Sequence, residues 1–211
     1  LPAGAGKSHQ SLRDIALLSS IPNFRIFQPV NYIEVFKILN HCIFREKNNC
    51  AIRLSIGPPP KKVIETTNNI SFQNGKGSIL RRGKKVLIFA YGQYMINEVL
   101  KLNKILNKKK IIPKIINMSC LNNFNKEWLK GVVRDCKYIF AIDDHSIVGG
   151  LGDNLQTELN NLKLLKNKFY FKIGLDKFPE CGTLQEVLKF HKLDSVSLSK
   201  NILKKIALHG N

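Results

Sequence analysis

Val86-Leu87-Ile88-Phe89-Ala90 is a continuous apolar run within a lysine-rich sequence, and it decides the fold class. A short strand without polar alternation is typical of a parallel sheet that helices cover on both faces. Met95–Leu106 follows with apolar residues at helical spacing, and Ile111–Met118 then returns to a strand pattern. Strands that alternate with helices predict an α/β fold with a parallel sheet and right-handed crossovers.

The same alternation continues along the rest of the chain. Further strands are predicted at 138–142 and 169–173, with helices at 126–136, 148–159, 183–190 and 197–208. Upstream, Arg25–Phe27 and Cys50–Leu54 predict two strands that flank a helix capped by Asn31. Between these regions the sequence is polar and broken by Gly57-Pro58-Pro59-Pro60. We therefore expect a first α/β unit at 1–60, a linker at 61–85 and a second domain at 86–211.

Composition excludes several classes of protein. The chain has 211 residues, of which 44% are apolar, so it can bury a substantial core. No apolar run approaches the roughly 20 residues that cross a bilayer, and no secretory signal pattern appears. The five cysteines form no C-x-x-C pair, which favours reduced thiols and predicts no metal site in this chain. We expect a cytoplasmic protein without a membrane partner.

The formal net charge of +19 raises the question of a nucleic-acid partner. The lysines, however, are spread along the chain, and the interleaving of aromatic and basic residues that single-strand binders use is missing. We interpret the charge as solvated lysine faces and expect no nucleic-acid partner. A positive field can still attract a small anionic substrate.

Two segments are candidates for the chemistry, because ligands of open α/β sheets sit at helix N-termini and at the carboxyl ends of strands. The first is Gly4-Ala5-Gly6-Lys7-Ser8-His9-Gln10, which matches only the second half of a phosphate-binding P-loop. The second is Asp143-Asp144-His145, followed by Ser-Ile-Val-Gly-Gly-Leu-Gly up to Gly152.

Taken together and in this order, the two segments resemble transketolase-like, thiamine-diphosphate-dependent enzymes. AGKSHQSLRDIALLSSIPN is similar to the G-P-T-H-Q…I-P-N stretch of their pyrimidine-binding domain. INMSCLNNFNKEWL, IDDHSIVGGLGD and IGLDKFPECGTLQEVLKFHKL resemble their C-terminal domain. The resemblance implies that 1–60 is the second half of a pyrimidine-binding domain and that 86–211 is a transketolase C-terminal domain.

The resemblance also implies roles for four residues. His9 matches the histidine that contacts the reacting carbons of the substrate, although by position alone it could simply cap a helix. Lys7 replaces the usual proline and either holds an anionic group or is a solvated surface lysine. Gln10 matches the family and either orders the turn or contacts substrate. Arg53 is either a substrate-binding residue or a structural ion-pair partner.

Two positions depart from the family pattern. Ala5 stands where the family often has an aspartate that contacts a sugar hydroxyl, and Ile56 stands where transketolases carry the arginine for the sugar phosphate. Arg53 lies three residues before Ile56, so on a regular strand the two side chains point to opposite faces. For Asp143-Asp144-His145 we expect a structural role, since in the family this segment belongs to the domain that supports the dimer.

The resemblance finally implies what this chain does not carry. The cofactor-binding residues of the family, which hold thiamine diphosphate and a divalent metal such as Mg²⁺, are expected upstream of Leu1. The chain is therefore expected to be the C-terminal portion of an enzyme that transfers a two-carbon ketol unit from a ketose to an aldose. Alone it should bind no cofactor and be inactive, with an N-terminal cofactor-binding domain or subunit, a homodimer and a sugar or sugar phosphate as partners.

Three alternatives stay open at this point. The chain could belong to a deoxyxylulose-phosphate synthase, to the E1-beta type of 2-oxoacid dehydrogenases, or to a non-catalytic assembly subunit.

Overall fold

The long apolar run of the sequence forms β4 (Lys85–Ala90), the central strand of a five-stranded sheet. The structure is a computed structural model that describes residues 10–210. The order of the strands is β3-β5-β4-β6-β7, and all pairs are parallel except β3 with β5. The other strands are β3 (Ser78–Arg81), β5 (Lys114–Asn117), β6 (Cys136–Ser146) and β7 (Phe169–Leu175). The predicted parallel α/β sheet is confirmed, with an antiparallel strand added at one edge.

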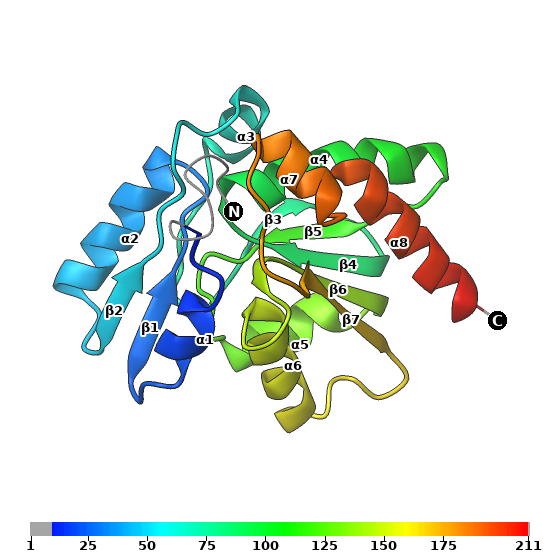
Figure 1. The fold of residues 1–211 in the computed structure, drawn as a ribbon. Helices are drawn as coiled ribbons and strands as arrows, with labels where there is room; N and C mark the ends of the chain where they lie inside the picture. The colour runs from blue at the N-terminus through cyan, green and yellow to red at the C-terminus, as the bar shows by residue number, and fades with distance from the viewer. Residues whose placement is uncertain (1–9, 211) are drawn as a thin grey trace.

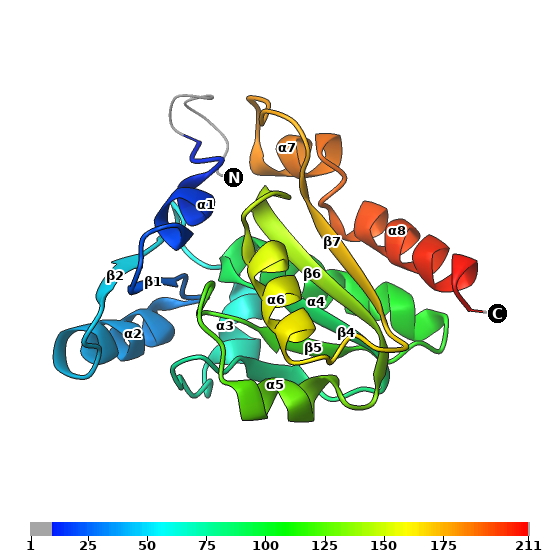
Figure 2. The ribbon, with the colours of Figure 1, turned by 90° about the horizontal axis from the view of Figure 1, so that it is seen from below.

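Helices cover both faces of this sheet, as Figures 1 and 2 show. One face carries α4 (Gly92–Lys108), α7 (Leu184–Phe190) and α8 (Ser195–Leu208), and the other carries α5 (Lys126–Val133) and α6 (Leu151–Asn161). Residues of β4 enter the two cores alternately: Val86, Ile88 and Ala90 face the first, and Leu87 and Phe89 face the second. The strand is apolar throughout because both of its faces are buried.

The first unit is smaller and consists of a two-stranded parallel sheet with two helices. It contains α1 (Asp14–Ser19), β1 (Phe24–Phe27), α2 (Tyr32–Phe44) and β2 (Asn49–Ile52). Asn31 caps α2 as predicted, since its side chain accepts a hydrogen bond from the Glu34 N–H at 2.8 Å. α1 is a short helix that begins at Asp14.

Backbone hydrogen bonds join the first unit to the larger sheet. The Gln28 N–H donates to the Ser119 carbonyl, and the Leu121 N–H donates to the Ile26 carbonyl, both at 2.8 Å. The apolar core around Leu87 and Phe89 also continues into this unit. The two units therefore share one core. We call the boundary along which they pack, where Ile26 and Gln28 meet Ser119 and Leu121, the seam.

The polar segment at 61–85 contains regular structure that its composition did not indicate. It forms α3 (Lys61–Thr67) and the edge strand β3, with a turn at Gly75 (φ +74°) between them. Val63 and Ile70 pack into the core on the α4 side, so this segment lies against the second domain. The division of the chain into domains at 60 and 86 stays a prediction.

Within the part of the chain that the structure describes, no helix combines the length and the apolar character that a bilayer crossing requires.

Candidate functional site

The carboxyl ends of the central strands, where open α/β sheets place their ligands, face the first unit of this chain. Tyr91 directly follows β4, Asn117 ends β5, and Asp143-Asp144-His145 lie in the last residues of β6. β6 is longer than predicted, so these three residues are part of the strand and do not follow it. All five are buried against the seam.

Arg53 lies at the centre of this seam and connects both units. Its Nη1 donates to Asp144 Oδ1 at 2.8 Å and to Gln28 Oε1 at 2.6 Å, and its Nε donates to Asp14 Oδ2 at 2.7 Å. Asp14 begins α1, Gln28 follows β1, and Asp144 lies on β6, so one guanidinium holds three elements together. These contacts are those of a structural ion pair, one of the two roles considered for Arg53.

The electrostatics of the pair follow from its burial. Burial by itself would raise the pKa of Asp144, but the adjacent Arg53 guanidinium lowers that pKa to about 2. Burial likewise opposes the charge on Arg53, yet Asp144 and Asp14 together raise the arginine pKa above its ordinary value. Both groups are therefore charged at neutral pH, and each compensates the other in a poorly hydrated place.

Asp143 points to different partners from its neighbour Asp144. It accepts hydrogen bonds from the N–H groups of Leu151 (2.8 Å) and Gly152 (3.0 Å) at the start of α6, and from the Tyr91 hydroxyl (3.0 Å). Burial raises the pKa of Asp143 to about 7, because the apolar surroundings outweigh these hydrogen bonds. The carboxyl group thus fixes the N-terminus of α6 against β6 and the residue after β4.

His145 is fully buried beside the same cluster. Its Nδ1 lies 2.9 Å from the Ser146 carbonyl, and its Nε2 lies 3.7 Å from Asp14 Oδ1. Burial lowers the pKa of His145, which favours a neutral ring whose Nδ1–H donates to that carbonyl. The arrangement of residues 143–145 supports the structural role expected for them.

Of the four predicted site residues, the structure describes Gln10 and Arg53. His9 and Lys7 lie outside the described residues. Gln10 is buried, and its Nε2 donates to the Glu180 carbonyl at 3.2 Å, a contact that orders the chain at this point. The Ile56 side chain is exposed, while its carbonyl accepts a hydrogen bond from the Tyr94 hydroxyl. Substrate contacts of Lys7, His9, Gln10 and Arg53 stay predictions.

A second polar cluster lies at the seam and was not predicted from the sequence. Glu34 is fully buried and accepts hydrogen bonds from the Val30 N–H (2.8 Å) and from Asn117 Nδ2 (3.2 Å). Burial raises the pKa of Glu34. The pattern Asn31-x-x-Glu34 is a helix N-cap signal and could have placed Glu34 in the first turn of α2. Its contact with Asn117 on β5 could not be found from local sequence.

The described residues do not supply a metal site. Between residues 10 and 210 no group of three His, Cys, Asp or Glu side chains is placed to hold a metal ion. They therefore do not fit the metal that accompanies the diphosphate group of the family's cofactor, and we derive no reaction step through it.

Comparison with known protein families agrees with this architecture. Residues 2–57 match the pyrimidine binding domain of transketolase, and residues 75–198 match the transketolase C-terminal domain. The chain belongs to the transketolase family and is a transketolase-like C-terminal portion.

Individual relatives are of two kinds. A protein from Methanocaldococcus jannaschii named a transketolase C-terminal section is 29% identical over 206 residues, which are 95% of this chain and 61% of the relative. A 1-deoxy-D-xylulose-5-phosphate synthase from Clostridium botulinum is 32% identical over 94% of this chain but only 31% of its own length. The chain thus spans less than two thirds of these relatives.

Solved structures give the same result. A split gene transketolase in an inactive beta4 tetramer superposes with a TM-score of 0.85 at 26% identity, covering 97% of this chain and 65% of the other. The transketolase of Campylobacter jejuni shares the fold at a TM-score of 0.71 and 15% identity, covering 96% of this chain and 29% of its own.

Proposed function

We propose that this chain is the C-terminal portion of a thiamine-diphosphate-dependent transferase that moves a two-carbon ketol unit from a ketose to an aldose. The observation that carries the proposal is the pair of transketolase domain matches, in order, over nearly the whole chain. The likeness to a split gene transketolase supports a chain that works together with a second polypeptide.

In this proposal, His9 exchanges protons with the oxygens on the reacting carbons of the sugar, as a neutral imidazole can do near pH 7. Lys7 holds an anionic end of the substrate by a charge-assisted hydrogen bond. Arg53 supplies a second positive charge for the anionic end of the substrate. Its guanidinium also pairs with Asp14 and Asp144 at the seam. Bound thiamine diphosphate supplies the carbanion chemistry, and its binding groups come from the partner polypeptide.

An exposed apolar face on α2 supports the need for a partner. Tyr32, Phe36, Leu39 and Ile43 recur at helical spacing, and the side chains of Phe36 and Ile43 are 72% and 67% exposed. The opposite side of the helix buries Ile38 and Glu34, so α2 carries apolar side chains on its exposed side as well as on its buried side. Such helices are normally buried, and we propose that an N-terminal cofactor-binding polypeptide covers this face. Assembly of two such complexes into a dimer is part of the same proposal.

The proposal is tested by mixing the chain with a separately produced N-terminal transketolase polypeptide. We expect ketol transfer that depends on both polypeptides and on added thiamine diphosphate and Mg²⁺. A stable complex without turnover would instead support a non-catalytic assembly subunit.

Deoxyxylulose-phosphate synthase is the second candidate, because relatives with that name reach 32% identity. The substrates separate the two activities. Turnover of a ketose phosphate or hydroxypyruvate supports ketol transfer, whereas turnover that requires pyruvate supports the synthase or an E1-beta type enzyme.

A further inference from the structure

Two cavities adjoin at Trp128, beside the edge strand β3. Their volumes are about 440 Å³ and 630 Å³, and both are lined by Ile79 and Trp128. Small-molecule sites commonly measure roughly 300–1,000 Å³. The larger cavity lies beside the turn before β4 and the first residue of β5. It is therefore at the amino ends of these strands, at the opposite end of the sheet from the Arg53 seam.

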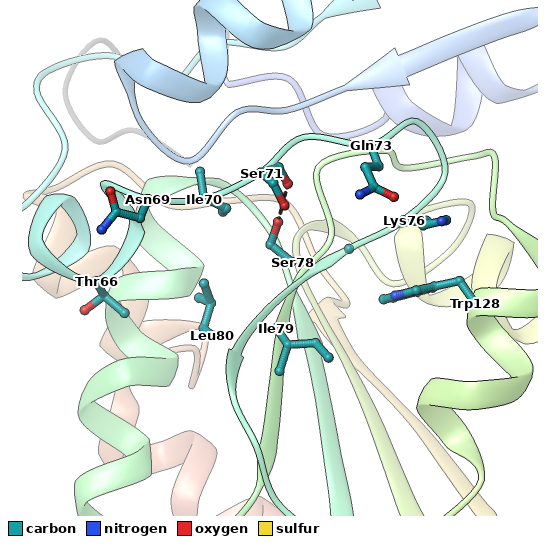
Figure 3. A pocket seen from close by; sticks show the side chains of 11 residues that line it. Thr66, Asn69, Ile70, Ser71, Gln73, Lys76, Ser78, Ile79, Leu80 and Trp128 are labelled. Atoms are coloured by element: carbon teal, nitrogen blue, oxygen red, sulfur yellow. Dashed lines mark hydrogen bonds between the residues drawn. The ribbon is translucent and has the colours of Figure 1, made fainter.

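Trp128 gives this place a planar aromatic surface. It is the single tryptophan of the sequence and is partly exposed. Phe89 contacts it edge to face, with ring centroids 6.4 Å apart, so a core residue supports the indole from one side. Figure 3 shows the side chain reaching from α5 toward β3, with Lys76 on the same side of the strand. Such a ring can stack with a second planar ring.

Gly131 leaves room for that second ring. It lies one turn after Trp128 on α5 and lines the larger cavity. Apart from its chain neighbours and the backbone of its own helix, a Cβ atom added at this glycine would meet nothing within 4 Å. The helix surface beside the indole is therefore open, and a larger side chain at this position would occupy the cavity without disturbing its neighbours.

Charged groups of both signs line the same cavity. Arg82 and Lys84 flank Gly83 in the turn before β4, and both are exposed residues that line the cavity. Lys114, at the start of β5, is held by its hydrogen bond to the Val132 carbonyl at 2.7 Å. A phosphate group is the natural ligand of such a cluster.

Two carboxylates complete the lining. They belong to Glu127, which also pairs with Lys130 at 2.6 Å, and to Asp135. Carboxylates accept hydrogen bonds from sugar hydroxyls, and they make the cavity unfavourable for a long polyanion. A ligand that satisfies the whole lining has a planar ring, hydroxyl donors and a phosphate.

We propose that the Trp128 cavity binds a nucleoside phosphate. The base stacks on Trp128 in the space beside Gly131, the phosphate meets Arg82 and Lys84, and the sugar hydroxyls face Glu127 and Asp135. Thiamine diphosphate also combines a planar ring with phosphate, but it lacks the sugar hydroxyls that would donate hydrogen bonds to the two carboxylates. Binding of a nucleoside phosphate at this cavity does not depend on the proposed ketol transfer.

The test uses the fluorescence of Trp128 in the complete chain at physiological ionic strength. ADP, adenosine, inorganic pyrophosphate and thiamine diphosphate are each titrated, with correction for absorbance. We expect saturable quenching by ADP, binding of adenosine weaker by about tenfold or more, and no quenching by pyrophosphate. Equal binding of ADP and pyrophosphate by calorimetry would reveal a simple anion site, and tighter binding of thiamine diphosphate than of ADP would overturn the nucleotide assignment.

Three variants make the test specific to this cavity. Gly131→Leu should abolish ADP binding, and the double variant Arg82→Ala, Lys84→Ala should weaken it by about tenfold or more. The matched control Lys200→Ala, Lys204→Ala removes two exposed lysines on α8 and should leave ADP binding unchanged. Thermal unfolding verifies that each variant is folded. Wild-type affinity in Gly131→Leu, or equal losses in both double variants, would contradict the proposal.

Discussion

Arg53 neutralises a buried carboxylate that belongs to the other unit of the chain. The Asp144 side chain is only 4% exposed and depends on this guanidinium for its charge. Arg53→Ala leaves Asp144 without its cation, and we expect a loss of about 3–5 kcal/mol of unfolding free energy, measured by urea denaturation. Adding Asp144→Asn should recover part of that loss. If Arg53→Ala retained wild-type stability, the ion pair would not hold the seam.

Asp143 should make the stability of the chain depend on pH. Its folded pKa of about 7 lies above the ordinary aspartate value of 3.8, so the folded state binds the proton more tightly. The stabilisation is complete below about pH 4 and is lost as pH rises through about 7. The advantage of wild type over Asp143→Asn in unfolding free energy should therefore shrink between these values. A gap that stayed constant with pH would show that burial does not raise this pKa.

His9 carries the catalytic part of the proposed function. If it does general acid–base work, His9→Ala in the reconstituted enzyme should lower kcat by about 10²-fold or more. The unfolding midpoint and the association with the N-terminal polypeptide serve as controls, because neither should change. Wild-type turnover by the variant would remove the catalytic role.

At the scale of the secondary-structure elements, two glycines on the same face of the sheet should respond in opposite ways to alanine. Gly131 lies within α5 with open space around it, so Gly131→Ala should raise the unfolding free energy by about 0.5–1 kcal/mol. Gly149 has φ +77°, and a Cβ there would overlap Ala16 of α1. Gly149→Ala should therefore destabilise the chain by more than about 1 kcal/mol.

The pair of glycine variants is measured by chemical denaturation under identical conditions. Equal effects of the two substitutions would mean that the close approach of α1 to the turn before α6 is not required.

At the scale of the whole molecule, the exposed face of α2 should control assembly. Phe36→Glu with Ile43→Glu places two charges on this face, and we expect binding to the N-terminal polypeptide to weaken by about tenfold or more. The matched control, Val196→Glu with Leu208→Glu, changes two exposed apolar residues on α8 and should bind normally. The dissociation constant is measured by calorimetry. Unchanged binding by the α2 variant would place the partner elsewhere.

Local sequence determined most of the elements. The apolar runs that became β4 and β7, the amphipathic pattern of α4 and the cap at Asn31 all depend on side chains that lie close together in the chain, so their periodicity is visible without a structure. The edge strand β3 was not predicted because it is only four residues long, and its strand conformation depends on pairing with β5, which begins 36 residues after β3 does.

The sequence by itself therefore determined the α/β fold, the two family segments and their order. Only the tertiary structure decided that Arg53 connects Asp14 with Asp144, that Glu34 is buried against Asn117, and that α2 leaves an apolar face exposed. The physical reason is distance along the chain: Arg53 and Asp144 are 91 residues apart, and Glu34 and Asn117 are 83 apart. Residues so far apart share no local pattern, and their side chains meet only when the two units pack together.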